Sequence, residues 1–205
     1  MHLKFNCNIW EMSGRKCLLF VVMAVLLFAS CQNETYMPKP RGYYRISVRD
    51  TSYQLFSDAA PFTFEHSAWA YVDTIQRHNE KYWLNLVYPQ QNAVVFLTYK
   101  SLKEAKLEDC INDSRTMAMK LIDRADDIQD HNIYDTANFV YGKIYEIIGN
   151  DAACPYQFWI TDRENHFIRA SLYFNCPPRN DSLAPIINHI KKDMLHLIET
   201  FAWKK

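Results

Sequence analysis

The stretch PYQFWITDRENHFIRASLYF, residues 155–174, decides the fold. Residues 155–161 and 167–174 are rich in β-branched and aromatic side chains, and the polar residues 162–165 lie between them. Two such runs around a short polar turn are typical of a β-hairpin. The sequence therefore predicts two antiparallel neighbouring strands. Pro177 and Pro178 end the second strand, because proline lacks the amide proton that a strand needs.

An amphipathic helix is predicted directly after the hairpin, over residues 182–203. Its apolar residues recur at steps of three and four, so they lie on one face of a helix. They are Leu183, Ile187, Ile190, Met194, Leu197 and Phe201. Lys191, Lys192 and Glu199 fall on the opposite side and face water. A helix with one apolar face has to pack on another element, here the sheet to which the hairpin belongs.

More strands are predicted before the hairpin. Strand-like runs occupy residues 43–48, 53–56, 62–75, 82–88, 93–99 and 139–148. The run AVVFLTY at residues 93–99 is mostly apolar, which predicts a strand that is buried on both faces.

A second helix is predicted from Ser101, where Ser101 and Glu104 match a capping box, and it is expected to fade by residues 130–132. Its buried stripe would hold Cys110, Ser114, Met117, Leu121 and Ile128. Its solvated face and end would hold Asp123, Asp126, Asp127 and Asp130.

Consecutive strands covered by helices predict an α+β fold with a mainly antiparallel sheet. The closing order of three strands and one helix resembles the PsbP/Mog1-like sandwich. That resemblance concerns architecture alone, since a fold does not determine a function.

The N-terminal residues predict a lipoprotein signal peptide. Arg15 and Lys16 precede 13 apolar residues, 17–29, which are fewer than the roughly 18 to 20 that a membrane-spanning helix needs. The run ends in Leu-Phe-Ala-Ser-Cys, which looks like a lipobox with Cys31 as the acylated residue. Residues 1–30 are then removed, residues 31–40 form a tether with two prolines, and residues 41–205 form a single globular domain. Met12 is an alternative start.

Composition excludes several classes of function. The four glycines, at positions 14, 42, 142 and 149, are too far apart to form a dinucleotide fingerprint or a phosphate-binding loop. After removal of the signal peptide the chain has 20 basic and 22 acidic residues, so no nucleic-acid binding is expected. Neither GxSxG nor HExxH occurs. The protein is therefore not expected to be an enzyme or to need a cofactor, although a hydrolase site built from scattered Asp and His residues stays open as a weak alternative.

The cysteines suggest a disulfide in an oxidising compartment. Cys154 precedes one strand of the hairpin and Cys176 follows the other, both 11 positions from residue 165. A turn centred there would place them opposite each other, within reach of a Cys154–Cys176 bond. The alternative is two free thiols, since a shift of one residue turns one of them away. Cys110 is expected to be an inert buried thiol.

Three residues of the last helix have the spacing of metal ligands. His189, Asp193 and His196 are four and three residues apart, so they lie on one flank. One helix rarely completes a metal site, and histidines beside an apolar stripe commonly make ordinary hydrogen bonds. No metal is therefore expected.

Aromatic residues gather in the N-terminal half of the domain. Either they form part of the core, which is more common in strands, or they form a binding surface. They are Tyr43, Tyr44, Tyr53, Phe56, Trp69, Tyr71, Tyr82 and Trp83.

The segment PKPRGYYRI at residues 38–46 resembles the start of the mature domain in the gliding-motility lipoprotein D family (GldD) of Bacteroidetes. Later stretches are also similar to that family: residues 53–54, 61–65, 156–158, 166–169, 193–200 and 203. The resemblance covers the whole mature chain.

The resemblance implies an accessory or assembly subunit of the gliding-motility machinery linked to type IX secretion. It implies a palmitate-type lipid anchor on Cys31, a place in the cell envelope facing the periplasm, and protein partners. The outer membrane is favoured over the inner one. It implies no catalytic residue and no cofactor. The alternative is a periplasmic module of the PsbP/Mog1 type that binds a ligand or a peptide.

Overall fold

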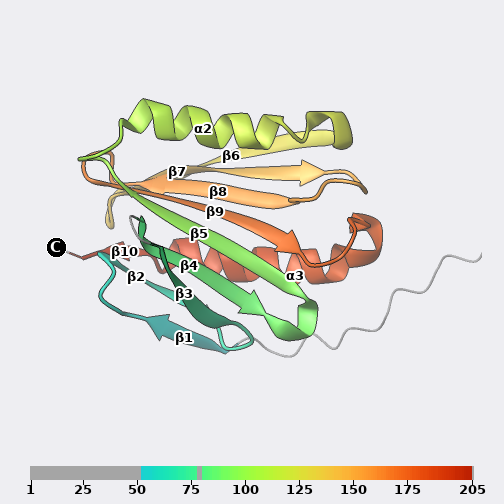
Figure 1. Ribbon diagram of the computed structural model, residues 1–205, viewed down its shortest axis with the longest axis horizontal. Coiled ribbons are helices and arrows are strands. Elements are labelled where there is room, and N and C mark those ends of the chain that lie inside the picture. The colour runs from blue at the N-terminus through green and yellow to red at the C-terminus, as the bar shows by residue number, and fades with distance from the viewer. Residues whose placement is uncertain (1–51, 78–79, 205) are drawn as a thin grey trace, which may run out of the picture. The chain divides into compact units, whose positions relative to one another are not determined.

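A seven-stranded antiparallel sheet forms the centre of the computed structural model, which describes residues 52–77 and 80–204 (Figure 1). The strands lie in the order β3-β4-β5-β9-β8-β7-β6. Their bounds are β3 Tyr71–Arg77, β4 Glu80–Tyr88, β5 Ala93–Ser101, β6 Asp127–Asp135, β7 Val140–Ile148, β8 Tyr156–Thr161 and β9 His166–Phe174. Each pair of neighbours in this order is antiparallel.

A smaller antiparallel sheet contains β1 (Tyr53–Phe56), β2 (Phe62–Ser67) and β10 (Ala202–Trp203), in the order β1-β2-β10. It brings the start of the described chain beside its end, because β2 pairs with both outer strands. Phe62, Phe64 and Phe201 are all at most 1% exposed and stack on one another in its core.

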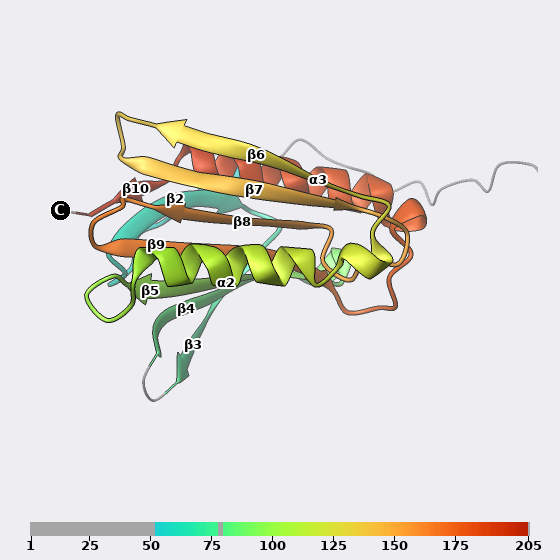
Figure 2. The same ribbon diagram turned by 90° about the horizontal axis from the view of Figure 1, so that it is seen from above.

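The helices α2 (Leu107–Met119) and α3 (Asn180–Glu199) lie on opposite faces of the large sheet (Figure 2). The buried face of α3 packs with the inward side chains of both sheets in one large core. From α3 and the segment after it, this core takes Ile190, Met194, Leu197, Ile198 and Phe201. The short turns Pro89–Gln91 and Ile122–Arg124 are 3-10 helices. No helix in the described part of the chain is long and apolar enough to cross a membrane.

The expected α+β class and mainly antiparallel sheet are confirmed. The strands predicted from residues 53, 82, 93, 139 and 155 and the closing hairpin all occur within two residues of their expected starts. The run at residues 62–75 is divided between two strands, β2 and β3, which lie in different sheets. The strand predicted at residues 43–48, the tether and Cys31 lie outside the described residues.

The start of α2 differs from the prediction. The helix begins at Leu107, and Ser101 is the last residue of β5. The amides of Glu104 and Ala105 donate to the carbonyl of Ser101, so the residues between the two elements form a turn. The capping-box prediction was therefore wrong, because β5 pairs with β9 up to Ser101.

The end of that predicted helix was also wrong. Residues 127–135 form the edge strand β6, which pairs with β7 along its whole length. Ile128 does pack with Ala118 and Tyr145, but it does so from a strand. The acidic side chains of β6 are mostly exposed, and charges on an edge strand discourage pairing with another chain.

Two further expectations need correction. The last helix ends at Glu199, and Ala202 and Trp203 belong to β10. In β5 the run at residues 93–99 is not buried on both faces, since Phe96 is 42% exposed. The face of β5 that bears Phe96 is the one on the α2 side, where the candidate site lies.

Candidate functional site

The residues with metal-ligand spacing on α3 do not converge on one point. The side chain of Asp193 is 1% exposed, and its Oδ2 lies 3.8 Å from Nε2 of His189. The Tyr53 hydroxyl of β1 donates to Asp193 Oδ1 over 3.4 Å. His196 turns to β2 instead, where its Nε2 lies 2.7 Å from Oε2 of Glu65. Within the described residues no three side chains of His, Cys, Asp or Glu form a metal-binding group.

Asp193 is a buried acid with incomplete hydrogen bonding. Burial raises the pKa of its carboxyl, and His189 and hydrogen bonds from Ser67, Tyr53 and Tyr88 oppose that rise. Oδ2 has no hydrogen-bond partner in the described part of the molecule. Burial and then the charge of Asp193 raise the pKa of Tyr88 in turn.

The cluster around Asp193 joins α3 to the small sheet. Tyr53 donates to Asp193 and also stacks on the ring of His196, with ring centroids 3.6 Å apart. Glu65 holds His196 from β2, and its own amide donates to the Thr200 hydroxyl. These contacts hold β1 and β2 against α3.

The cysteines of the described residues, Cys110, Cys154 and Cys176, are free thiols, and the structure does not contain the Cys154–Cys176 disulfide. Cys154 is buried and Cys176 is exposed. Gln157 pairs with Ser171, so the hairpin is centred on residue 164 rather than 165, and the same register places Cys154 across from Phe174. Burial raises the pKa of the Cys154 thiol to about 12. Cys110 is buried, as expected, and burial raises the pKa of its thiol.

The face of the sheet on the α2 side is only partly covered. The register aligns Phe96 of β5 with Ser171 of β9 and Gln157 of β8, so their side chains share this face. Asn85 of β4 is aligned with Phe96 in the same row. Residues of α2 contact β8 and β9, and the helix leaves the β4 side of the row open.

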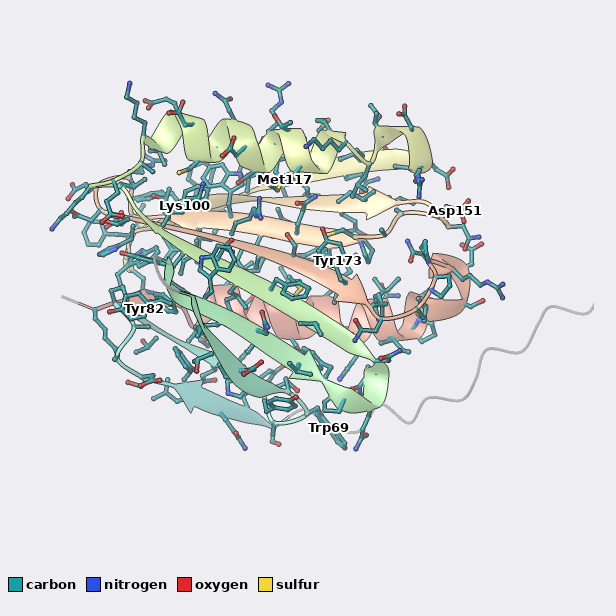
Figure 3. All side chains as sticks on the ribbon, in the orientation of Figure 1. Trp69, Tyr82, Lys100, Met117, Asp151 and Tyr173 are labelled. Carbon is teal, nitrogen blue, oxygen red and sulfur yellow. The ribbon has the colours of Figure 1, made fainter. Side chains whose placement is uncertain are left out.

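A groove fills the open half of this face. It consists of a hollow of about 470 Å³ and an adjoining one of about 260 Å³. The two share Trp83, Thr98, Met117 and Arg169 in their walls, so they lie next to each other. Tyr173 lines the larger hollow and Lys100 lines the smaller one. Both residues are labelled in Figure 3, together with Met117 of α2.

The walls of the groove combine aromatic, polar and cationic groups. Phe96 and Tyr173 meet edge to face, with ring centroids 5.7 Å apart. Burial raises the pKa of the Tyr173 hydroxyl, and the neighbouring Cys154 adds to that rise. At the smaller hollow, Nζ of Lys100 lies 3.6 Å from the carboxylate of Asp113. The groove can therefore receive a ligand that is partly apolar and partly polar. We take it as the candidate functional site.

Sequence reasoning found only part of this groove. Trp83 was among the aromatic residues considered for a binding surface, but Phe96, Arg169 and Tyr173 were not. A usable signal was present in β9, where Arg169, Ser171 and Tyr173 alternate with Ile168, Ala170 and Leu172. One face of that strand is therefore polar, although the strand lies in the middle of the sheet.

Of the comparisons with known proteins, the match to a family model identifies the family. The family model described as gliding motility lipoprotein GldD matches residues 33–203. No curated protein matches the chain. Among solved structures, the chain is similar to the solution structure of cyanobacterial PsbP (CyanoP) from Synechocystis sp. PCC 6803. That similarity has a TM-score of 0.42 and 12% identity, and it covers 77% of this chain and 95% of that one.

Proposed function

The chain belongs to the gliding motility lipoprotein GldD family, and from this membership we propose that it is an accessory or assembly subunit of the envelope machinery for gliding and type IX secretion. The observation that carries the proposal is the extent of the family match. It begins at residue 33, two residues after Cys31, and ends at residue 203. The whole chain after the lipobox thus has the family's pattern.

Anchoring through Cys31 is part of the proposal. Acyl chains supply about 0.8 kcal/mol of membrane affinity per buried methylene, and more than one chain anchors a protein stably. The domain would then face the periplasm, with the outer membrane favoured over the inner one. Its prolines Pro38 and Pro40 would stiffen the short tether between the lipid and the first strand.

The proposed role is to bind protein partners rather than to catalyse a reaction. The groove beside α2 supports this role, because exposed aromatic side chains beside polar ones are typical of recognition surfaces. The alternative, a periplasmic module for a small ligand, is favoured by the buried polar groups in the same groove. The proposed role and this alternative differ in the bound molecule, which is a protein segment in the first and a small ligand in the second.

The experiment is complementation of a deletion strain with Cys31→Ala. Its matched control is Cys176→Ala, which removes an exposed thiol elsewhere in the same chain. We expect Cys31→Ala to release the protein from the membrane fraction and to lose gliding and normal levels of secreted proteins, whereas Cys176→Ala restores both. Full complementation by Cys31→Ala would contradict the proposal.

A further inference from the structure

The floor of the groove carries two polar side chains from the strands, Gln157 and Ser171. Gln157 is 4% exposed and Ser171 is 8% exposed, and both line the larger hollow. Among the described residues, no hydrogen bond joins the side chain of either one to another group. Neither is among the fully buried, unpartnered side-chain atoms of the described residues, so their polar atoms remain open to the hollow. A molecule that displaces water from the groove has to supply hydrogen-bond partners for them, so an occupant with donors and acceptors fits better than a purely apolar one.

Arg169 is a cation of the groove without an anionic partner among the described residues. Its guanidinium donates to the sulfur of Met117, which is a weak acceptor. Within the described residues, neither Arg169 nor Lys120 is part of an ion pair, whereas Lys100 is paired with Asp113. Arg169 is half-buried between two hollows and retains donors that match a carboxylate. The unpaired positive charge of Arg169 therefore favours a ligand with an acidic group at this position.

An aromatic wall flanks the cation. Phe96 is 42% exposed and Tyr173 is 41% exposed, and both line the same hollow as Arg169. Trp83 lines both hollows. A ligand for this groove would therefore place an apolar side chain against the rings, next to its acidic group.

An extended peptide fits these three requirements together. Its backbone offers donors and acceptors to the amides of Gln157 and Asn85, each of which can do both. Its side chains alternate in direction, so an acidic and an apolar one can reach different walls. The two adjoining hollows, of about 470 Å³ and about 260 Å³, leave room for such a segment, whereas an acyl chain would leave the polar floor unpaired.

We propose that the groove between α2 and strands β4, β5 and β9 binds an extended acidic segment of a partner protein, whose carboxylate pairs with Arg169. This inference rests on the proposed function, since it names the chemistry of the partner at the candidate site. The partner segment carries an Asp or Glu for Arg169 and an apolar or aromatic residue for the wall formed by Phe96 and Tyr173.

The first test is photo-crosslinking in intact cells that produce the full lipidated chain. A benzophenone amino acid replaces Phe96, and a second strain carries it at Tyr134, which is 71% exposed on β6. Mass spectrometry then identifies the crosslinked segment. We expect position 96 to crosslink to a protein segment with an Asp or Glu within a few residues, and position 134 not to reach that segment.

The second test asks whether Arg169 reads the acidic group. Arg169→Gln is compared with Arg115→Gln, which removes the same charge from the exposed side of α2. The crosslinked segment is synthesised with its acid and with the matching amide, and both peptides are titrated against the lipidated protein. A charge-assisted hydrogen bond predicts at least about tenfold weaker binding of the acidic peptide to Arg169→Gln, and no change for Arg115→Gln.

Several outcomes would overturn the inference. They are the absence of a crosslink at position 96, a crosslink to a glycan or a lipid, and equal binding of both peptides to the wild-type chain. Thermal melts of each variant show whether it is folded; if Arg169→Gln does not fold, the acid and amide peptides on the wild-type chain decide alone. Loss of gliding in Cys31→Ala together with no crosslink at position 96 would leave the proposed function standing and remove this inference.

Discussion

The two faces of the central sheet differ in how completely they are covered. On the face that α3 and the small sheet cover, Leu86, Val95 and Leu172 are at most 1% exposed. On the face that α2 partly covers, Phe96, which follows Val95, and Tyr173, which follows Leu172, are more than 40% exposed. Along β5 and β9, every second side chain therefore points into the closed core, and the side chains between them line the open groove.

The difference shows how one sheet can serve two purposes. The closed face contains stacked phenylalanines and one apolar face of a helix, so it supplies most of the burial that stabilises the fold. The open face retains aromatic, amide and guanidinium groups that the fold does not use. Because these groups contribute little to stability and can still bind another molecule, they support a role of the open face in binding a partner.

The largest effect is expected from substitutions that compare the two faces directly. Phe64→Ala empties a fully buried site of β2, in the core that covers the closed face, and should cost about 3–5 kcal/mol in the free energy of unfolding. Phe96→Ala removes a half-exposed ring from the open face and should cost less than about 1 kcal/mol. Urea unfolding measures both. Equal losses would show that the groove face carries as much of the stability as the core does.

A pH-dependent effect is expected from Asp193, the buried acid of α3, the helix that covers the closed face. Its pKa is raised, so the folded chain binds the proton more tightly than the unfolded chain does. This favourable contribution is complete below the ordinary pKa of an aspartate and is lost as the pH rises through the folded pKa. Asp193→Asn removes this dependence, so its stability relative to the wild type should increase from pH 4 to pH 7.

The measurement is a set of urea unfolding curves for both proteins across that range. Asp181→Asn, in the exposed first turn of the same helix, is the control for the loss of a carboxylate. A relative stability of Asp193→Asn that falls with rising pH would contradict the assigned cause. His189, Tyr53, Ser67 and Tyr88 face the carboxyl and are unchanged in this comparison.

The smallest effect concerns the thiols at the end of the hairpin. Cys176 is exposed and should react with a maleimide within minutes, whereas the buried Cys154 and Cys110 should react only after unfolding. Burial and the raised pKa of Cys154 both reduce its thiolate. Mass spectrometry of alkylated protein without a reductant checks this. If Cys176 were fully protected from alkylation and became reactive after a reductant was added, the result would support the Cys154–Cys176 disulfide.

The sequence predicted the closed face well, because apolar periodicity reports burial. The stripe from Ile187 to Leu197 and the hairpin around residues 162–165 were both found in this way. It failed at β6, where exposed charges and few apolar residues leave little periodic signal, and pairing with β7 decides the conformation.

The groove was largely missed for a related reason. Its residues come from five separate elements, β4, β5, β8, β9 and α2, and the strand register aligns those from the sheet. Arg169 and Phe96 belong to it because Thr98 pairs with Arg169 and Phe96 with Ser171. A single sequence does not reveal such a register, although the polar alternation of β9 marks the face.

The claim that the closed face holds the fold while the open face recognises a partner has a direct test. The deletion strain is complemented with Phe96→Ala combined with Arg169→Gln, and spreading and secreted proteins are measured together with the amount of folded protein in the envelope. The account predicts a folded, membrane-bound variant at the wild-type level with gliding and secretion lost. Wild-type gliding and secretion by this variant would contradict it.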